Sequence, residues 1–304
     1  MSTNSCCSSD NSQPEQLHVA IIGSGSGAFA SAIKAAEGGA RVTIIEGADV
    51  IGGCCVNVGC VPSKILIRAA QLAHQQRTNP FDGLENIQPQ LSRSLLAHQQ
   101  TARVEELRGA KYQSILENNP ALSLLKGYAR FKNENTLLVQ MADGSEEELV
   151  ADRILIATGS TPSIPPIDGL VDTPYWTSTE ALFSEELPSS LVVIGSSVIA
   201  LEIAQAYARL GSSVTVLARH TLLYAEDPLL GEKLTECFEK EGIRVLNNTQ
   251  ASHVSYSNNG FSLETNEGTL TAEKLLISTG RHANTDKLGL ENVGVETDKS
   301  GAIV

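Results

Sequence analysis

The sequence predicts an α/β protein with two similar halves, each a parallel β-sheet between layers of helices. In the first half an apolar run, a glycine-containing turn and a helix of small residues follow one another over residues 18–38. The same order returns over residues 191–210, and the next apolar run comes at the same interval in both halves. Apolar runs that alternate with helical segments are typical of βαβ units, whose sheets are covered on both faces.

Composition narrows the class of protein. A chain of 304 residues can hold two domains, and its hydrophobic content of 41% without a long apolar run is that of a globular protein that does not span a membrane. The net charge of −13 argues against nucleic acid or an anionic membrane surface as a partner. The N-terminus lacks the basic flank and apolar core of a signal peptide, so six cysteines indicate a reducing compartment, and we expect the cytoplasm.

The first residues predict a tail. Residues 1–16 are polar, and we expect them to be disordered. They contain the adjacent pair Cys6 and Cys7. The pair is either incidental to a Ser-rich tail or a site for a soft metal, since paired thiolates suit Hg(II).

The first glycine turn has the pattern of a dinucleotide-binding motif. Residues 18–22 predict a buried strand, which leads directly into the turn. There Gly23 permits a tight turn, Gly25 lets a pyrophosphate approach the backbone, and Ala28 lets the following helix pack closely, with its N-terminus toward the phosphates. The next predicted strand ends on Glu46, at the offset of an acid that binds ribose hydroxyls. Together these features predict a Rossmann-like domain.

Two cysteines five positions apart follow this motif. On a regular helix Cys55 and Cys60 would lie well over a quarter-turn apart, whereas a disulfide needs Cβ atoms within about 4 Å. Gly59 and Pro62 allow the distorted turn that a bridge would require. A disulfide that closes so short a loop adds little to the stability of the fold. A helix N-terminus with Lys64 nearby favours the thiolate form of these cysteines. The pattern therefore favours a redox pair over two buried cysteines that never meet.

The rest of the first half predicts helices and then strands. Residues 65–118 are mostly helical with a loop at about 79–89, and a strand at 154–157 leads into Thr158 and Gly159. Two further strands are expected at residues 122–128 and 136–141, with a turn at Asp143 and Gly144, and a proline-rich connector at 161–188.

A second glycine turn begins at Gly195 and continues through Ser197 and Ala200 into a helix. The acid expected at the end of the next strand is replaced by Ala218, and Arg219 follows. An acid would repel a 2′-phosphate, whereas a guanidinium can hold one, so this half is predicted to prefer NADPH over NADH. A solvated surface arginine is the alternative. Ser197 in place of the middle glycine weakens the motif taken alone.

The repeat continues toward the C-terminus. Residues 275–281 repeat the pattern of residues 154–160. Cys237, within the helical run 232–241, is expected to be a packed apolar residue. The six histidines have no spacing typical of metal ligands.

The segment GGCCVNVGCVPSK resembles the redox-active segment of the FAD-dependent pyridine nucleotide–disulfide oxidoreductases. It is most similar to the Hg(II)-reducing members of that family, because VNVGCVPSK continues into ILIRAA. The resemblance runs from about His18 onward. It implies an oxidoreductase with two Rossmann-like domains, the FAD/NAD(P)-binding fold.

The resemblance implies a reaction in which electrons pass from NADPH through FAD and a Cys55–Cys60 disulfide to Hg(II), yielding Hg(0) in mercury detoxification. Cys60 would be the thiolate beside the flavin and Cys55 the more exposed exchange thiol, and both would bind Hg(II). Lys64 would lie near the reactive end of the flavin, paired with Glu202, and would stabilise developing negative charge. The alternative for Glu202 is an ordinary helix residue.

The resemblance also implies two cofactor-binding sets. The FAD set is Gly23, Gly25, Ala28, Glu46, Gly53, Cys54, Lys64, Ala129, Thr158 and Gly159. The NADPH set is Gly195, Ser197, Ala200, Glu202, Arg219 and Gly280. The expected parts are a tail at 1–16, an FAD-binding domain at 17–160 with a helical excursion at 65–120, a connector at 161–188, an NADPH-binding domain at 189–282, and the start of a return to the FAD domain at 283–304.

Two features depart from the family. Cys54 stands where threonine is usual, and this third thiol could join Hg(II) binding or scramble the disulfide. The sequence stops at Val304, before the Gly-Asp segment and the C-terminal dimerisation domain of relatives. We therefore expect a fragment of a homodimeric protein, poorly active or inactive by itself.

Two other functions stay open. One is a different dithiol reductase such as dihydrolipoamide dehydrogenase, which Arg219 disfavours because those enzymes use NADH. The other is a non-catalytic nucleotide- or thiol-binding fragment.

Overall fold

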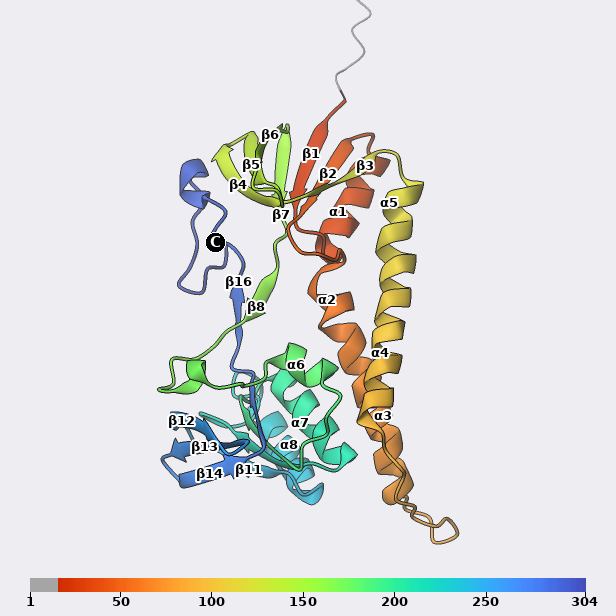
Figure 1. Ribbon diagram of the computed structural model, residues 1–304, viewed down its shortest axis with the longest axis vertical. Coiled ribbons are helices and arrows are strands. Elements are labelled where there is room, and N and C mark those ends of the chain that lie inside the picture. The colour runs from red at the N-terminus through yellow and green to blue at the C-terminus, as the bar shows by residue number, and fades with distance from the viewer. Residues whose placement is uncertain (1–15) are drawn as a thin grey trace, which may run out of the picture.

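The computed structural model describes residues 16–304, so Cys6 and Cys7 lie outside the described residues. Figure 1 shows two sheet-containing halves at opposite ends of the long axis. Long helices run alongside both halves, and two thin strands connect them. None of the described helices combines the length and apolarity needed to cross a membrane.

The first half is built on a four-stranded parallel sheet, as predicted. Its strands, in spatial order, are β3 (Leu122–Lys126), β2 (Arg41–Glu46), β1 (His18–Ile22) and β7 (Arg153–Ile156). Helix α1 (Ser26–Glu37) packs on this sheet through Ala28 and Ala32, which are fully buried. Small side chains on this helix face let its backbone approach the strands closely.

The prediction of one strand over residues 122–128 is wrong, because the chain turns at Gly127. Its N–H bonds to the Glu46 carbonyl at 3.0 Å, and an added Cβ would lie 2.7 Å from the Gln140 carbonyl oxygen. The residues beyond Gly127 leave the parallel sheet. They form a separate antiparallel sheet of β4 (Tyr128–Asn133), β5 (Thr136–Gln140) and β6 (Glu146–Val150).

Helices fill most of the segment 65–120, as predicted, but the helical part of the chain begins earlier, at Gly53. It consists of α2 (Gly53–Asn57), α3 (Cys60–Arg77), α4 (Arg93–Arg108), a π-helical turn (Gly109–Gln113) and α5 (Ser114–Asn118). Helices α3 and α4 extend from the first half down to the second, where α3 packs against α7 (Val198–Leu210) (Figure 1).

The second half repeats the plan of the first. Its parallel sheet has the order β11 (Arg244–Leu246), β10 (Ser213–Leu217), β9 (Ser190–Ile194) and β15 (Lys274–Ile277). An antiparallel sheet is again attached, made of β12 (Ala251–Ser257), β13 (Gly260–Thr265) and β14 (Gly268–Ala272). The matching sheet orders confirm the two halves as copies of one α/β plan.

The expectation that Cys237 is a packed apolar residue is wrong. Cys237 lies on α8 (Pro228–Lys240), and its side chain is exposed rather than packed. The face of α8 that enters the core carries the neighbouring Phe238, which is 1% exposed, and Gly231. Cys237 is one position, about 100° of helix rotation, away from that face.

The two halves are connected by the short antiparallel strands β8 (Ser160–Pro162) and β16 (Arg281–Ala283). Between β8 and the second sheet lie a 3₁₀ turn (Leu170–Asp172) and α6 (Ser178–Phe183). After β16 the chain packs against the first half, where the Phe131 N–H donates to the Leu288 carbonyl at 2.7 Å, and a last 3₁₀ turn spans Leu290–Val293.

A bidentate ion pair joins α7 to the end of α8. Arg209 donates to both carboxylate oxygens of Glu241 at 2.7 and 2.6 Å, and both side chains are largely buried, at 16% and 17% exposed. Burial acts to raise the pKa of the Glu241 carboxyl, but the hydrogen bond and charge of Arg209 bring that pKa below its ordinary value of 4.5. The ion pair therefore stabilises the folded state above pH 4.5, and this contribution is lost as the pH falls through the lowered folded-state pKa.

Replacing Glu241 by alanine should lower the free energy of unfolding by about 3–5 kcal/mol, because the Arg209 charge is left without its partner. Urea unfolding measures this loss. Glu236→Ala is the matched control: its ion pair with Lys233 is exposed to solvent, so little change in the free energy of unfolding is expected. Equal losses in the two variants would contradict the prediction.

Candidate active site

The first glycine turn requires glycine at its first position. Gly23 has φ +105°, its N–H bonds to the Ile45 carbonyl at 2.8 Å, and an added Cβ would collide with the Ala157 carbonyl oxygen. Next along the chain, Gly25 and Gly27 present their backbone at the start of α1, and an added Cβ at Gly27 meets nothing within 4 Å. The turn therefore offers open backbone at a helix N-terminus, which fits a pyrophosphate.

Glu46 ends β2 beside this turn, as expected. The Ser24 hydroxyl donates to one of its carboxylate oxygens and the Ala48 N–H donates to the other at 2.7 Å. These bonds fix the orientation of the carboxylate. A carboxylate has about four acceptor positions, so it can still accept from ribose hydroxyls.

The second turn repeats this geometry. Gly195 has φ +142°, its N–H bonds to the Leu217 carbonyl at 3.1 Å, and an added Cβ would collide with the Ser278 carbonyl oxygen. Ser197 is exposed at the N-terminus of α7, and Ala200 is fully buried against the sheet.

At the end of β10 the chain has no acid. Ala218 is fully buried, with its N–H bonded to the Leu246 carbonyl at 2.9 Å. Arg219 follows it and is exposed, and it forms no ion pair with any residue of the described part of the chain. Its guanidinium is therefore available beside the second turn.

The cysteine segment contains the distorted turn that was expected. Helix α2 ends at Asn57, and Gly59 with φ −130° and ψ −112° breaks the helix before α3 begins at Cys60. Pro62 lies in the first turn of α3. There its missing N–H removes no helix hydrogen bond.

The cysteine helix and the first glycine turn touch through their backbones. Gly53 has φ +64°, and an added Cβ would lie 2.6 Å from the Gly25 Cα. The Gly52 N–H also donates to the Ser24 carbonyl at 3.0 Å. This contact holds α2 against the backbone of the first glycine turn, at the start of α1.

Cys55 and Cys60 are both free thiols, one of the two states that a redox pair must adopt. The neighbouring Cys60 sulfur, toward which the Cys55 thiol can donate, raises the pKa of the Cys55 thiol, and burial raises this pKa further. The Cys55 thiol is therefore a weaker acid than an ordinary cysteine thiol.

The expectation that Cys55 is the more exposed thiol applies to the chain with a flavin beside Cys60, and it stays a prediction. In the structure Cys60 is exposed and Cys55 is half-buried. The reason is the helix break, since Cys55 lies within α2 whereas Cys60 starts α3 and turns outward after Gly59.

Lys64 and Glu202 form the expected pair across the two halves. The Lys64 ammonium lies 2.7 Å from both carboxylate oxygens of Glu202, which joins α3 to α7. The side chains are 59% and 32% exposed, so the pair contributes little to stability. It does place a positive charge one helical turn from Cys60.

The remaining expected positions lie around the connecting strands, except for Ala129. Gly159 and Gly280 stand next to β8 and β16 with φ +69° and +150°, and an added Cβ at either meets nothing within 4 Å. The Thr158 carbonyl accepts from the Asn284 side chain at 2.9 Å. Ala129 is buried on β4, in the core under the first sheet.

Sequence reasoning missed Arg281. Its Nη2 atom lies 3.6 Å from the Cys54 sulfur, and its Nε donates to the Ser160 hydroxyl at 2.8 Å. The only signal was that Arg281 follows Gly280 in the repeated segment, at the position that Ser160 holds in the first copy.

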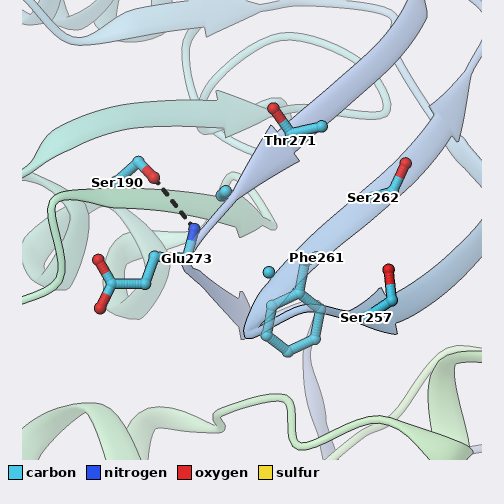
Figure 2. A pocket seen from close by; sticks show the side chains of 8 residues that line it. Ser190, Ser257, Phe261, Ser262, Thr271 and Glu273 are labelled. Carbon is cyan, nitrogen blue, oxygen red and sulfur yellow. Dashed lines mark hydrogen bonds between the residues drawn. The ribbon is translucent and has the colours of Figure 1, made fainter.

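A hollow of about 290 Å³ lies elsewhere, between the two sheets of the second half (Figure 2). Its labelled lining residues are Ser190, Ser257, Phe261, Ser262, Thr271 and Glu273. At its edge the Glu273 N–H donates to the Ser190 hydroxyl at 3.0 Å, and the Glu273 carboxylate accepts from Ser189 at 2.8 Å. None of the cysteines within residues 16–304 lines this hollow.

Comparison with known proteins gives consistent results. The family described as "Pyridine nucleotide-disulphide oxidoreductase" matches residues 17–304. A mercuric reductase of Shewanella putrefaciens is 73% identical over all of this chain and 55% of its own length, and one of Shigella flexneri is 58% identical over 95% of this chain and 52% of its own. The chain thus spans about half the length of the curated relatives that it matches.

Among solved structures, the HOCl-induced flavoprotein disulfide reductase RclA from Escherichia coli superposes with a TM-score of 0.83. It is 29% identical, and the match covers 94% of this chain and 62% of that one. The fold described above is therefore also found in a flavoprotein disulfide reductase.

Proposed function

Because the chain belongs to the pyridine nucleotide–disulphide oxidoreductase family, we propose that it is the FAD- and NADPH-binding part of a mercuric reductase, which reduces Hg(II) to Hg(0) in mercury detoxification. The observation that carries the proposal is the pair of neighbouring cysteines Cys55 and Cys60, on helices whose start contacts the first glycine turn. We place the reaction in the cytoplasm, where such a thiol pair can be kept reduced.

The chain's own residues fit both cofactors. The open backbone at Gly25 and Gly27, with Glu46 beside it, would hold the ADP half of FAD, and the turn at Gly195 with Arg219 would hold NADPH. When bound, the flavin would relay electron pairs from the nicotinamide to the cysteine pair and to the metal substrate.

The thiol pair would bind the substrate. Hg(II) is a soft ion that prefers thiolates, so the sulfurs of Cys55 and Cys60 would be its ligands. Cys55 would release its proton as its sulfur bonds to the ion. Lys64, oriented by Glu202, would stabilise negative charge that develops near Cys60.

The proposal is tested by reconstituting the chain with FAD and following NADPH oxidation. Oxidation that depends on Hg(II), with none driven by lipoamide or glutathione disulfide, is expected. Oxidation driven by lipoamide would instead identify a dihydrolipoamide dehydrogenase. A chain that binds neither FAD nor NADPH would refute the cofactor assignment.

Arg219→Ala should weaken NADPH binding by roughly 10- to 100-fold, because a charged hydrogen bond contributes about 1.5–3 kcal/mol. NADH binding should be unchanged, since NADH has no 2′-phosphate. Calorimetric titration with both nucleotides measures this. Arg244→Ala, which removes an exposed arginine from the neighbouring strand β11, is the control and should change neither affinity. Equal weakening of both nucleotides by Arg219→Ala would contradict the role.

Lys64→Met should slow the loss of flavin absorbance after mixing with NADPH by about 10²-fold, the effect of removing one electrostatic stabiliser. The free energy of unfolding should change by less than about 1 kcal/mol, because the Lys64–Glu202 pair is partly exposed. Lys64→Arg should restore part of the rate. Lys34→Met, which breaks an exposed pair with Glu37, should leave the rate unchanged. An unaltered rate in Lys64→Met would count against a role for this charge.

A further inference from the structure

A third thiol lies beside the redox pair. Cys54 directly precedes Cys55, and its side chain is exposed. Its sulfur rests against the turn that leads to Cys60, since a Cβ added at Gly59 would lie 3.2 Å from the Cys54 sulfur. The Cys54 sulfur therefore lies beside Gly59, the residue that directly precedes Cys60.

The Cys54 sulfur is held from the other side by Arg281. The guanidinium donates to this sulfur at 3.6 Å, and it is itself anchored to Ser160, through the hydroxyl at 2.8 Å and through the carbonyl. Ser160 and Arg281 begin the two strands that connect the halves. A charge-assisted contact of this kind orients the sulfur and favours the approach of anionic thiol complexes.

Both neighbouring cysteines act on the Cys55 thiol. Its pKa is raised chiefly by Cys60, toward which the Cys55 thiol can donate, and by burial, and the charge of an ionised Cys54 would raise it further. No cluster of three metal-ligating side chains is present among residues 16–304. The arrangement therefore suits stepwise transfer between sulfurs better than one ion held by all three.

We infer that Cys54 is an exchange thiol that takes Hg(II) from a soluble thiol complex and passes it to Cys60. This inference rests on the proposed function. In the first step the Cys54 sulfur forms a bond to Hg(II), one small thiolate is displaced, and that thiolate takes up the proton that Cys54 releases. In the second step the Cys60 sulfur bonds to Hg(II) and displaces Cys54, which takes up the proton of Cys60. Mercury stays Hg(II) throughout, so no oxidant or reductant is needed.

The test uses the full chain with Cys6→Ser and Cys7→Ser, so that tail thiols do not contribute. The reduced protein is mixed with the Hg(II) complex of free cysteine, and the rise of Hg–thiolate absorbance is followed by stopped flow. Cys54→Ser should slow capture at least tenfold while the final amount of bound Hg(II) stays the same. Cys237→Ser, which removes another exposed thiol, should not slow it.

A second measurement locates the ion. In a Cys55→Ser/Cys60→Ser variant, mass spectrometry of the intact protein and its peptides should find mercury on the Cys54 peptide. Capture at the unaltered rate in Cys54→Ser, or no mercury on Cys54, would overturn the inference. If the protein with all three thiols bound no Hg(II) at all, the proposed function itself would fail. Unchanged thermal unfolding of Cys54→Ser would exclude misfolding as the cause of slow capture.

Discussion

Cys60→Ser should reduce Hg(II)-dependent NADPH oxidation on the order of 10³-fold or more, the scale of loss when a residue that forms the covalent bond is removed. Cys60 is the first residue of α3, and it raises the pKa of the neighbouring Cys55 thiol. Serine has nearly the same shape but can neither form a disulfide nor bind Hg(II) strongly. Steady-state oxidation of NADPH in the FAD-loaded chain measures the effect.

Two controls separate chemistry from folding in this variant. FAD and NADPH should bind to Cys60→Ser as they do to the unaltered chain, because serine has nearly the same size and shape as cysteine. Cys237→Ser should keep full activity, since Cys237 is exposed on α8, far along the chain from the pair. Retention of more than a tenth of the activity in Cys60→Ser would show that electrons reach Hg(II) without the disulfide.

Gly53→Ala should both destabilise the protein and weaken FAD binding at least tenfold. Gly53 has φ +64°, where a non-glycine residue costs about 1–3 kcal/mol. The new Cβ would also lie 2.6 Å from the Gly25 Cα, so the cysteine helix and the first glycine turn must move apart. Urea unfolding measures the first effect, and flavin fluorescence on titration measures the second.

Gly27→Ala is the matched control for stability. Gly27 lies inside α1 and an added Cβ meets nothing within 4 Å, so alanine there should stabilise the helix by about 0.5–1 kcal/mol. Opposite signs for the two substitutions are therefore expected. If both lowered stability by the same amount, close backbone contact at Gly53 would not be the cause.

The local patterns predicted the repeated plan of the two halves well. Glycine turns, small-residue helices and apolar strands depend on residues that are near each other in sequence, and both sheets have the expected strands next to the turns. The break between α2 and α3 was also foreseeable, because Gly59 and Pro62 stand within the segment itself.

Errors arose where a residue's environment comes from distant segments. The strand expected over residues 122–128 ends before Gly127, where the chain packs against Gln140 of a later strand. Cys237 was expected to be packed, but its place on α8 relative to the core depends on how that helix is rotated against the sheet. Neither fact can be read from neighbouring residues.

The amino-acid sequence by itself determined that this chain has two dinucleotide turns and a closely spaced thiol pair, because these depend on short-range spacing and on backbone conformations that glycine allows. Only the tertiary structure decided which groups meet those thiols. Arg281 reaches Cys54 across 227 positions, and this contact follows from how the two halves pack against one pair of helices. The Lys64–Glu202 pair spans 138 positions, but the resemblance to a known family already implied it. The energy that holds the two halves together is distributed over many buried side chains, so no single motif encodes it.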